Sequence, residues 1–192
     1  MREINYENYY WQNNLIRLRG VLESDWEMGY INRFDTPARF LLQSEVELPP
    51  TINEAHKSND KYLDFDQSRG RIMFTIETPD GLAVGAINLN SIDERNGTFS
   101  IGMQIDGLQR NKGYGTSAMQ ILLKYAFFER RLNKYYGSVL DGNIASATML
   151  KKLGCREEGI RTQMVYSNGK YHDEILYGLT KDEFLFNNNS VI

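Results

Sequence analysis

A short segment that joins a predicted strand to the longest predicted helix is the feature that most constrains this chain. It runs Arg110-Asn111-Lys112-Gly113-Tyr114-Gly115-Thr116, after a strand over 98–105 and at the start of a helix over about 113–131. The glycines let the backbone approach a ligand, and the first helical amides carry the positive end of the helix dipole. The arginine and lysine add charge-assisted hydrogen bonds. This placement predicts an anion site that suits a diphosphate, the alternative being a tight turn with solvated basic side chains.

The segments around this junction alternate between strand and helix periodicity. Residues 72–76, 82–89 and 98–105 have the pattern of strands separated by turn residues, which predicts an antiparallel meander. Apolar residues recur at three- and four-residue spacing through the helix that follows. Beyond it the sequence predicts a strand over 134–140, a helix over 145–153 that ends at Gly154, and a hairpin around Asn168-Gly169.

The amino-terminal third has the least regular pattern. Alternating apolar and basic residues over 15–19 predict a half-buried strand. Two capping boxes, Ser24 with Glu27 and Thr51 with Glu54, predict helix starts. The Thr36-Pro37 pair predicts another, because proline has the φ angle of a first helical turn.

The order of these elements predicts a mixed α/β (α+β) fold. Strand, helices, three strands, helix, strand, helix and hairpin give one central, mostly antiparallel sheet flanked by helices. A chain of 192 residues fits a single domain, 1–192, with a core over about 15–186. Hydrophobic residues at 41% and charged residues at 24% place it well away from disordered chains.

Composition also excludes several classes of protein. The net charge of −3 comes from mixed acids and bases, so the basic stripe required for nucleic-acid binding is missing. No stretch approaches the roughly 20 apolar residues of a membrane helix, and the start of the chain does not have the pattern of a secretory signal. The single cysteine, Cys155, suits a reducing compartment, so we expect a cytoplasmic protein. His56 and His172 are too few for a metal cluster, and no metal is expected.

Two common nucleotide-binding motifs fit the glycine segment poorly. A Rossmann fingerprint needs a third glycine where Ala118 stands, and it follows a parallel strand instead of a meander. A Walker A motif needs Gly-Lys-Ser/Thr at its end, which this segment does not have.

The segment instead resembles the pyrophosphate-binding R/Q-x-x-G-x-G/A motif of GNAT N-acetyltransferases, which that family carries at the same strand-to-helix junction. A second stretch agrees, because Asn143-x-x-Ser146, Leu150-Lys151-Lys152-Leu153-Gly154 and Glu158-Gly159 are similar to the family's downstream segment. The similarity covers roughly residues 15 to 186. Ser146 and the closing hairpin most resemble the RimJ/RimL branch of ribosomal-protein alanine and polyamine acetyltransferases.

The resemblance implies a GNAT fold in which the sheet splays between its fourth and fifth strands and acetyl-CoA lies in the gap. Backbone groups of Met103, Gln104 and Ile105 would pair with the pantetheine arm as an added strand would. Asn143 would bond the pantetheine or the adjacent backbone, and it is also placed to cap a helix. The diphosphate would be held by seven consecutive residues: Arg110, Asn111, Lys112, Gly113, Tyr114, Gly115 and Thr116.

The implied reaction is direct acetyl transfer to a neutral amine, with a backbone amide near Met103 stabilising the developing oxyanion. Many relatives carry a glutamate base where this chain has Ser100, and a tyrosine acid where it has Leu150. We expect Ser146 to protonate the leaving thiolate, the alternative being a simple helix-surface role. Cys155 stands where a core aromatic residue is usual, so a nucleophilic role is not expected. The base candidates are each also explained as turn or strand residues: Glu77, Asp93, Glu94, Tyr166 and Asp173.

The amine acceptor is expected to be a protein N-terminal amine. One alternative is a small amine such as a polyamine or an aminoglycoside, and another is a non-catalytic module that binds acyl-CoA. Acidic residues around Glu45 and Glu47 would favour a polycation if they gather at the acceptor cleft. A homodimer joined through the carboxy-terminal strands is compatible with the sequence.

Overall fold

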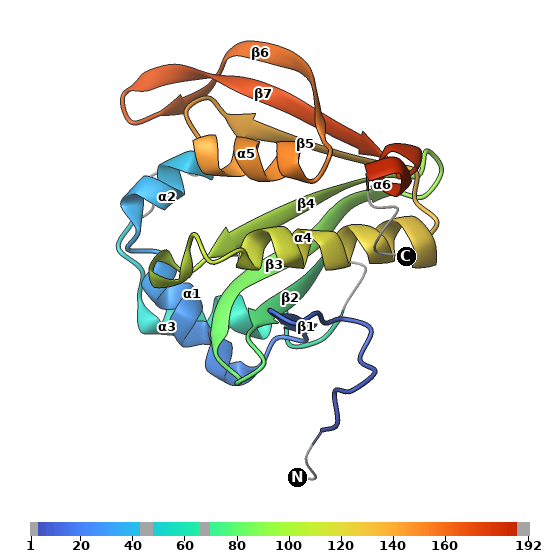
Figure 1. Cartoon of the computed structure of the whole chain (residues 1–192). Helices are drawn as coiled ribbons and strands as arrows, with labels where there is room; N and C mark the ends of the chain where they lie inside the picture. Colours follow the sequence, from blue (N-terminus) through green and yellow to red (C-terminus); the bar gives the residue numbers. More distant parts are fainter. Residues whose placement is uncertain (1–3, 43–47, 66–69, 188–192) are drawn as a thin grey trace.

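The computed structural model describes residues 4–42, 48–65 and 70–187 as one sheet with helices on both faces (Figure 1). Seven strands have the spatial order β1-β2-β3-β4-β5-β7-β6. This confirms the predicted mixed α/β fold. The strands are β1 (Arg17–Arg19), β2 (Arg71–Glu77), β3 (Ala83–Asp93), β4 (Thr98–Ile105), β5 (Lys134–Leu140), β6 (Arg156–Ser167) and β7 (Lys170–Thr180). The α-helices are α1 (Trp26–Asn32), α2 (Thr36–Leu41), α3 (Ile52–Asp60), α4 (Tyr114–Lys124), α5 (Ile144–Lys152) and α6 (Lys181–Asn187).

The sheet divides between β4 and β5. All other neighbouring strands are antiparallel, whereas β4 and β5 are parallel and pair only at Thr98 with Lys134 and at Phe99 with Tyr135. Beyond these pairs the two strands diverge (Figure 1). The predicted splay between the fourth and fifth strands is therefore confirmed.

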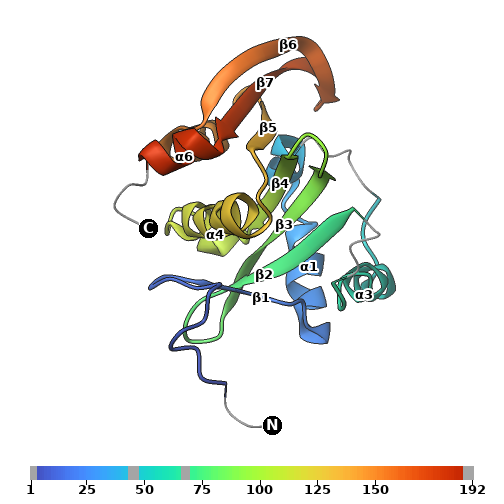
Figure 2. The same ribbon diagram turned by 90° about the vertical axis from the view of Figure 1, so that its right-hand side faces the viewer.

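The hydrophobic core lies between the sheet and α4. Figure 2 shows α4 on one side of β2 to β4 and α1 with α3 on the other. Phe99, Leu122 and Phe127 are fully buried, and the rings of Phe99 and Phe127 meet edge to face at a centroid distance of 5.3 Å. Alternate residues of β4 thus face the core under α4, and the others face the side of α1 and α3.

Several predicted element boundaries were wrong. Ser24 and Glu27 do not form a capping box. Instead, the Asp25 carboxylate accepts from the Leu22 amide at 2.9 Å, because a short 3₁₀ turn over Glu23–Asp25 precedes α1. The box of Thr51 and Glu54 is confirmed. The helix predicted over 113–131 ends as a π turn over Tyr125–Glu129. The hairpin strand β6 begins at Arg156, well before Met164, where the sequence pattern of the hairpin begins, and α6 had not been predicted.

A network of charged residues joins β1, β2 and the start of α1. Arg19 donates to both oxygens of Asp25, at 2.7 and 2.9 Å, and to Glu77 at 2.7 Å. Thr75 donates to Asp25 at 2.7 Å. Burial raises the pKa of Asp25, but the hydrogen bonds from Arg19, Leu22 and Thr75 outweigh it and hold that pKa below its ordinary value. Each oxygen of this buried carboxylate therefore has a donor.

Replacing Asp25 by asparagine should destabilise the fold in a pH-dependent way. A charge-assisted hydrogen bond contributes about 1.5–3 kcal/mol, so we expect the variant to lose about 2 kcal/mol or more at neutral pH. Because the folded-state pKa lies below the unfolded one, this contribution is present above about pH 4 and is lost as the pH falls through the folded value. Urea denaturation at pH 7 and pH 3 measures both effects. If the free energies of unfolding of wild type and variant differed by the same amount at pH 7 and pH 3, the assignment would be contradicted.

Candidate active site

The gap between β4 and β5 exposes backbone groups of β4. The Asp106 amide donates to the Val84 carbonyl at 2.9 Å. Val84 and Asp106 are therefore a hydrogen-bonded pair in the antiparallel register of β3 and β4. Such pairs alternate, so the backbone of Gln104 faces β3 while that of Met103 and Ile105 faces the gap. The prediction of a backbone contact from Gln104 does not fit this register. Met103 and Ile105 remain placed for it.

The glycine segment begins α4 at the open end of this gap. A 3₁₀ turn over Gly107–Gln109 follows β4, and Gly113 is the N-cap of α4 with a left-handed φ of 84°. The first backbone hydrogen bond of the helix runs from the Ser117 amide to the Gly113 carbonyl, at 3.1 Å. The amides of Tyr114, Gly115 and Thr116 therefore have no carbonyl acceptor within the helix. The described fold brings the predicted anion site and the free edge of β4 together.

Gly115 allows α4 to approach both β4 and α5. A Cβ built at this position would lie 3.0 Å from Met103 Cε and 3.5 Å from Met149 Sδ. These are flexible side-chain ends, so a larger residue would displace them without moving the backbone. The space it would fill lies where α4, β4 and α5 meet beside the gap.

The basic side chains of the segment already have partners. The Arg110 guanidinium donates to Asp35 at 2.5 Å and to the Ile105 carbonyl at 3.3 Å, and Lys112 donates to Gln109 at 2.7 Å. Asp35 is also the N-cap of α2 and accepts from the Ala38 amide. Burial raises the pKa of Asp35, but these hydrogen bonds lower it below its ordinary value. Arg110 thus connects the glycine segment to α2 in addition to any contact with a phosphate.

Helix α5 contributes the second predicted motif. The Asn143 side chain accepts from the Ser146 amide at 3.2 Å, which confirms its N-cap role, and its Nδ2 donates to the Leu41 carbonyl at 3.4 Å. Ser146 lies three residues before Met149, and therefore on the same face of α5 as the side chain that reaches Gly115. Leu150 is buried, so the position that is tyrosine in many relatives belongs to the core here.

Each residue considered as a base has a structural role elsewhere. Glu77 pairs with Arg17 and Arg19, and Glu94 pairs with Arg130. Asp93 accepts from turn amides, and Asp173 accepts from the Gln163 amide. Tyr166 is exposed and packs against Tyr171. None of the bases considered from the sequence is therefore assigned to the gap.

The only cysteine lies in the core. Cys155 is 5% exposed, and burial raises the pKa of its thiol to about 12. At neutral pH it stays protonated, and a thiol in that state is a poor nucleophile.

One buried acid near the gap was missed by sequence reasoning. Glu174 on β7 is 6% exposed and accepts from Ser138 on β5 at 2.7 Å and from Arg161 on β6 at 3.0 Å. Tyr135 faces the core beside Phe99, so Ser138 lies on the opposite face of β5. Only the pairing of β5, β6 and β7 brings these residues together, and no local pattern indicates it.

We call the face of the gap opposite α4 the acceptor face. Beside the gap its side chains on β3, β4 and β5 are neutral. At the end where β4 and β5 pair, Lys134 is bonded to Glu158, and Glu174 on β7 is paired with Arg161. The Gln104 side chain lies on this face, and its Nε2 is buried with no hydrogen-bond partner in the described part of the chain. The neutral members are Asn88, Asn90, Ser100, Gly102, Gln104, Tyr136 and Ser138.

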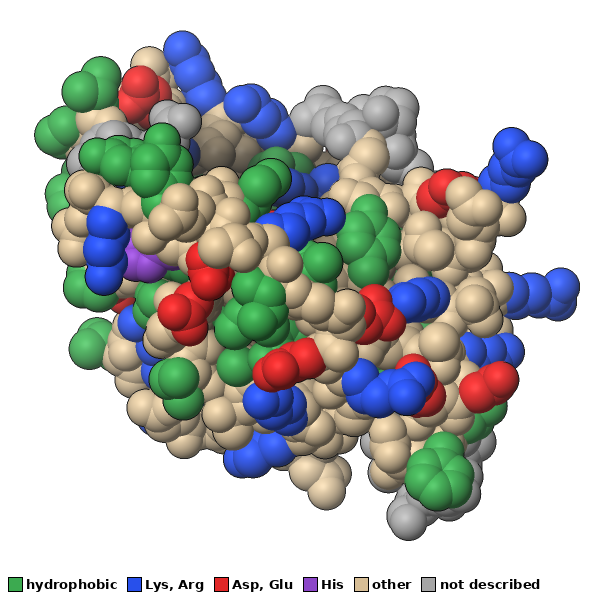
Figure 3. Space-filling model, turned by 90° about the horizontal axis from the view of Figure 1, so that it is seen from above, with side chains coloured by type: hydrophobic (Ala, Val, Ile, Leu, Met, Phe, Trp, Pro, Cys, Tyr) green, Lys and Arg blue, Asp and Glu red, His purple; other side chains and the backbone are tan. Residues whose placement is uncertain are grey.

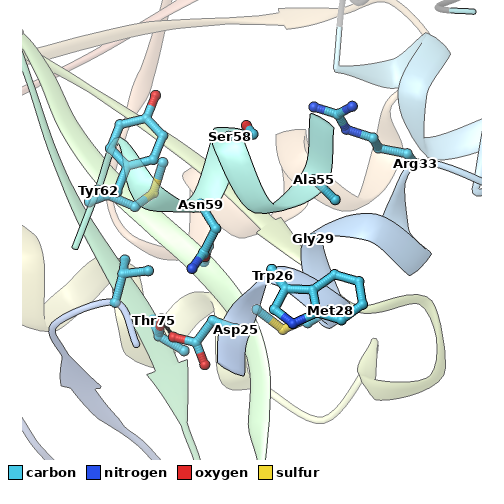
Figure 4. Close-up of a pocket in the computed structure, with 13 residues that line it drawn as sticks. Asp25, Trp26, Met28, Gly29, Arg33, Ala55, Ser58, Asn59, Tyr62 and Thr75 are labelled. Atoms are coloured by element: carbon cyan, nitrogen blue, oxygen red, sulfur yellow. Dashed lines mark hydrogen bonds between the residues drawn. The ribbon is translucent and has the colours of Figure 1, made fainter. Parts of the chain in front are cut away.

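A separate cavity of about 150 Å³ lies between α1, α3 and the strands β2 and β3 (Figure 4). Trp26, Met28, Tyr62 and Met73 line it, and none of its lining residues comes from β4, β5, α4 or α5. The Asp25 side chain at its base points to Thr75 (Figure 4) and is already fully hydrogen-bonded. This cavity does not open on the glycine segment, so the gap remains the candidate site.

The surface over the carboxy-terminal strands carries mixed charges. Viewed from above, acidic and basic side chains are interspersed (Figure 3).

Within residues 4–42, 48–65 and 70–187, no three His, Cys, Asp or Glu side chains form a group that could hold a metal ion. No helix in those ranges combines the length and apolar character that crossing a bilayer requires.

A splayed sheet, a glycine-rich helix start and an exposed strand edge define an acyl-CoA-binding acetyltransferase fold. Residues 16–156 match the family model described as acetyltransferase (GNAT) domain, and the chain belongs to this family. It is an N-acetyltransferase that uses acetyl-CoA.

The chain is similar to named relatives and to solved structures over most of its length. It is 27% identical over 180 residues to "SPbeta prophage-derived uncharacterized N-acetyltransferase YokL" of Bacillus subtilis, covering 93% of this chain and 97% of that protein. It is 35% identical over 105 residues to "Putative ribosomal N-acetyltransferase YdaF" of the same organism, covering 55% and 57%. The fold matches the spermidine N-acetyltransferase of Vibrio cholerae, solved with CoA and spermine, with a TM-score of 0.79 at 18% identity, covering 90% and 99%.

Replacing Gly115 by valine should weaken CoA binding without unfolding the protein. The branched side chain would fill the space between Met103 and Met149 beside the gap, so we expect the dissociation constant for acetyl-CoA to rise more than tenfold. Gly29→Val is the matched control, because Gly29 is also helical and a Cβ placed there would have no neighbouring atom within 4 Å. Isothermal titration measures binding, and thermal unfolding checks both variants. Equal affinity in wild type and Gly115→Val would contradict the placement of CoA.

Proposed function

We propose that this N-acetyltransferase acts on the N-terminal α-amine of a protein, as a RimJ/RimL-like member of its family. The neutral acceptor face is the observation that carries this proposal. A polyamine is a multiple cation, and its recognition calls for carboxylates without counter-charges. In the described part of the chain the acid beside this face, Glu174, is paired with Arg161. Glu45 and Glu47, the acids that would favour a polycation, lie outside the described residues.

The buried amide of Gln104 supports the same acceptor. Its Nε2 is a donor without a partner among the described residues. A peptide offers carbonyl oxygens next to its α-amine, whereas a protonated polyamine offers only further donors. A peptide acceptor would satisfy this group once the Gln104 side chain turns from its buried position toward the gap, and the cost of leaving it unpaired would be removed.

Acetyl-CoA supplies an activated acetyl thioester, and the residues at the gap fit it. The amides at the start of α4 would hold the diphosphate, with Arg110, Asn111, Lys112 and Gly113 forming the preceding turn. The gap-facing backbone of Met103 and Ile105 would pair with the pantetheine arm. Asn143 would contact it from the start of α5.

The chemistry assigned to the chain is positioning, oxyanion stabilisation and proton delivery. The neutral amine nitrogen forms a bond to the acyl carbon, the carbon–sulfur bond breaks, and the amine loses one proton while the thiolate gains one. The Met103 amide would stabilise the negative charge that develops on the acyl oxygen. The Ser146 hydroxyl would deliver the proton to the thiolate.

Ser146→Ala should lower turnover and leave cofactor binding unchanged. Loss of a positioned proton donor typically costs about 10²-fold in kcat, and the hydroxyl contributes nothing to the diphosphate site. Thr148→Ala is the control, since Thr148 is an exposed hydroxyl residue on the same helix. Steady-state kinetics give kcat and the KM for acetyl-CoA. A Ser146→Ala enzyme with the kcat of wild type would show that Ser146 is only a helix-surface residue.

A panel of acceptors separates the N-terminal amine from its alternatives. We expect kcat/KM for peptides with a free α-amine to exceed that for spermidine or an aminoglycoside by at least about tenfold, a difference of about 1.4 kcal/mol in transition-state binding. Peptides with a blocked N-terminus and an internal lysine should not react. Mass spectrometry locates the acetyl group. Preference for spermidine would overturn the proposal in favour of a polyamine acetyltransferase.

A further inference from the structure

We infer that Asn88 is a positioning residue for the oxyanion site and sets the direction of the Met103 amide through Gly102. The inference rests on the proposed function, in which that amide stabilises the acyl oxygen. Asn88 belongs to β3, one strand away from the gap, so the role inferred for it does not depend on contact with acetyl-CoA.

Asn88 is bonded to the peptide group that carries the proposed oxyanion donor. Its Nδ2 donates to the Gly102 carbonyl at 3.0 Å, and the residue is only 8% exposed. The Gly102 carbonyl and the Met103 amide belong to one planar trans peptide group, so they point in opposite directions. In the register of β3 and β4 the Asn88 backbone also pairs with Gly102, and the side-chain bond adds to this pairing. A carbonyl held toward β3 in this way aims the N–H into the gap.

A chain of side-chain amides holds Asn88 itself in place. Its Oδ1 accepts from Asn90 Nδ2 at 2.6 Å, and the Asn90 oxygen accepts from the Ser91 hydroxyl at 2.9 Å. Only one orientation of the Asn88 carboxamide allows hydrogen bonds at both its oxygen and its nitrogen. Hydrogen bonds in such a chain polarise one another, which also strengthens the Met103 N–H as a donor.

The local sequence accommodates this bond, and the splay makes it necessary. A Cβ built at Gly102 would lie 2.8 Å from Asn88 Nδ2, so a larger residue there would displace the Asn88 side chain from this position. After Phe99, β4 has no pairing with β5. The gap side of the Gly102–Met103 peptide is thus unsupported, and the orientation of the peptide depends on the β3 side.

The test combines kinetics with the infrared carbonyl stretch of bound acetyl-CoA labelled with ¹³C at the acyl carbon. Asn88→Leu and Asn88→Asp both keep the shape of the side chain and remove its donor. Asn59→Leu is the matched control, because Asn59 Nδ2 also donates to a backbone carbonyl, that of Leu22 at 2.9 Å, far from the gap. Asn90→Ala is a milder variant that leaves the bond between Asn88 and Gly102 in place. Thermal unfolding confirms that each protein is folded.

We expect both Asn88 variants to lose about tenfold or more in kcat, with the KM for acetyl-CoA within about twofold of wild type, since misaiming an oxyanion donor affects mainly the transition state. The carbonyl stretch should move toward its value in free acetyl-CoA. Asn90→Ala should give a smaller change of the same kind, and Asn59→Leu none. Wild-type kcat and carbonyl stretch in both Asn88 variants would overturn the inference. If wild type acetylated no peptide, the proposed acceptor would fail, while the carbonyl stretch would still report on Asn88.

Discussion

The parting of β4 from β5 is the constraint on which the rest of the structure depends. Two parallel strands that pair at only two positions leave backbone donors and acceptors on the inner edges of the sheet without a strand partner, and Arg110 occupies one of them, the Ile105 carbonyl. Unpaired backbone groups away from water are costly, so such an edge favours a ligand that can pair with it. The fold places a helix start with free amides at the open end of the same edge. Strand pairing and anion binding are thereby available to a single extended, charged molecule.

The same geometry gives the two faces of the gap different tasks. On one face, α4 and α5 approach each other through Gly115 and Met149. On the other face the side chains beside the gap are neutral and polar, and the Gln104 amide nitrogen has no partner among the residues that the structure describes. Figure 2 shows α4 on the first face and α1 with α3 on the second, and in the proposed function the acceptor approaches from the second. The register of β3 against β4 decides which residues it meets there.

Much of the fold was predictable from the sequence, because local patterns carried it. Strands β2 to β5 lay close to the expected ranges, and the Asn-Gly turn located the final hairpin. The glycine segment was placed correctly because its spacing and its position after a strand are both local features. Family membership, inferred from two separated motifs, is shown by the match over residues 16–156. The acceptor and the roles of Ser146, Met103 and Asn143 stay proposals.

What could not be predicted depends on contacts between distant segments. The orientation of Gln104 follows from strand register, which the sequence of one strand does not contain. Arg110 was expected to serve a phosphate, yet Asp35, 75 residues away, also binds it. The Ser24 capping box failed because Arg19 and Thr75 bind Asp25 and fix the helix start there. Glu174 becomes visible only when β5, β6 and β7 are paired.

Helix α2 has a mechanical consequence for the enzyme. It is tied at its beginning to the β4 half of the sheet through Asp35 and Arg110, and at its end to the β5 half through Leu41 and Asn143. The six residues of α2 therefore bridge the two halves of the sheet at the open end of the gap. Spreading the two halves would strain both attachments together, so the width of the gap between β4 and β5 is limited by a helix as well as by the sheet.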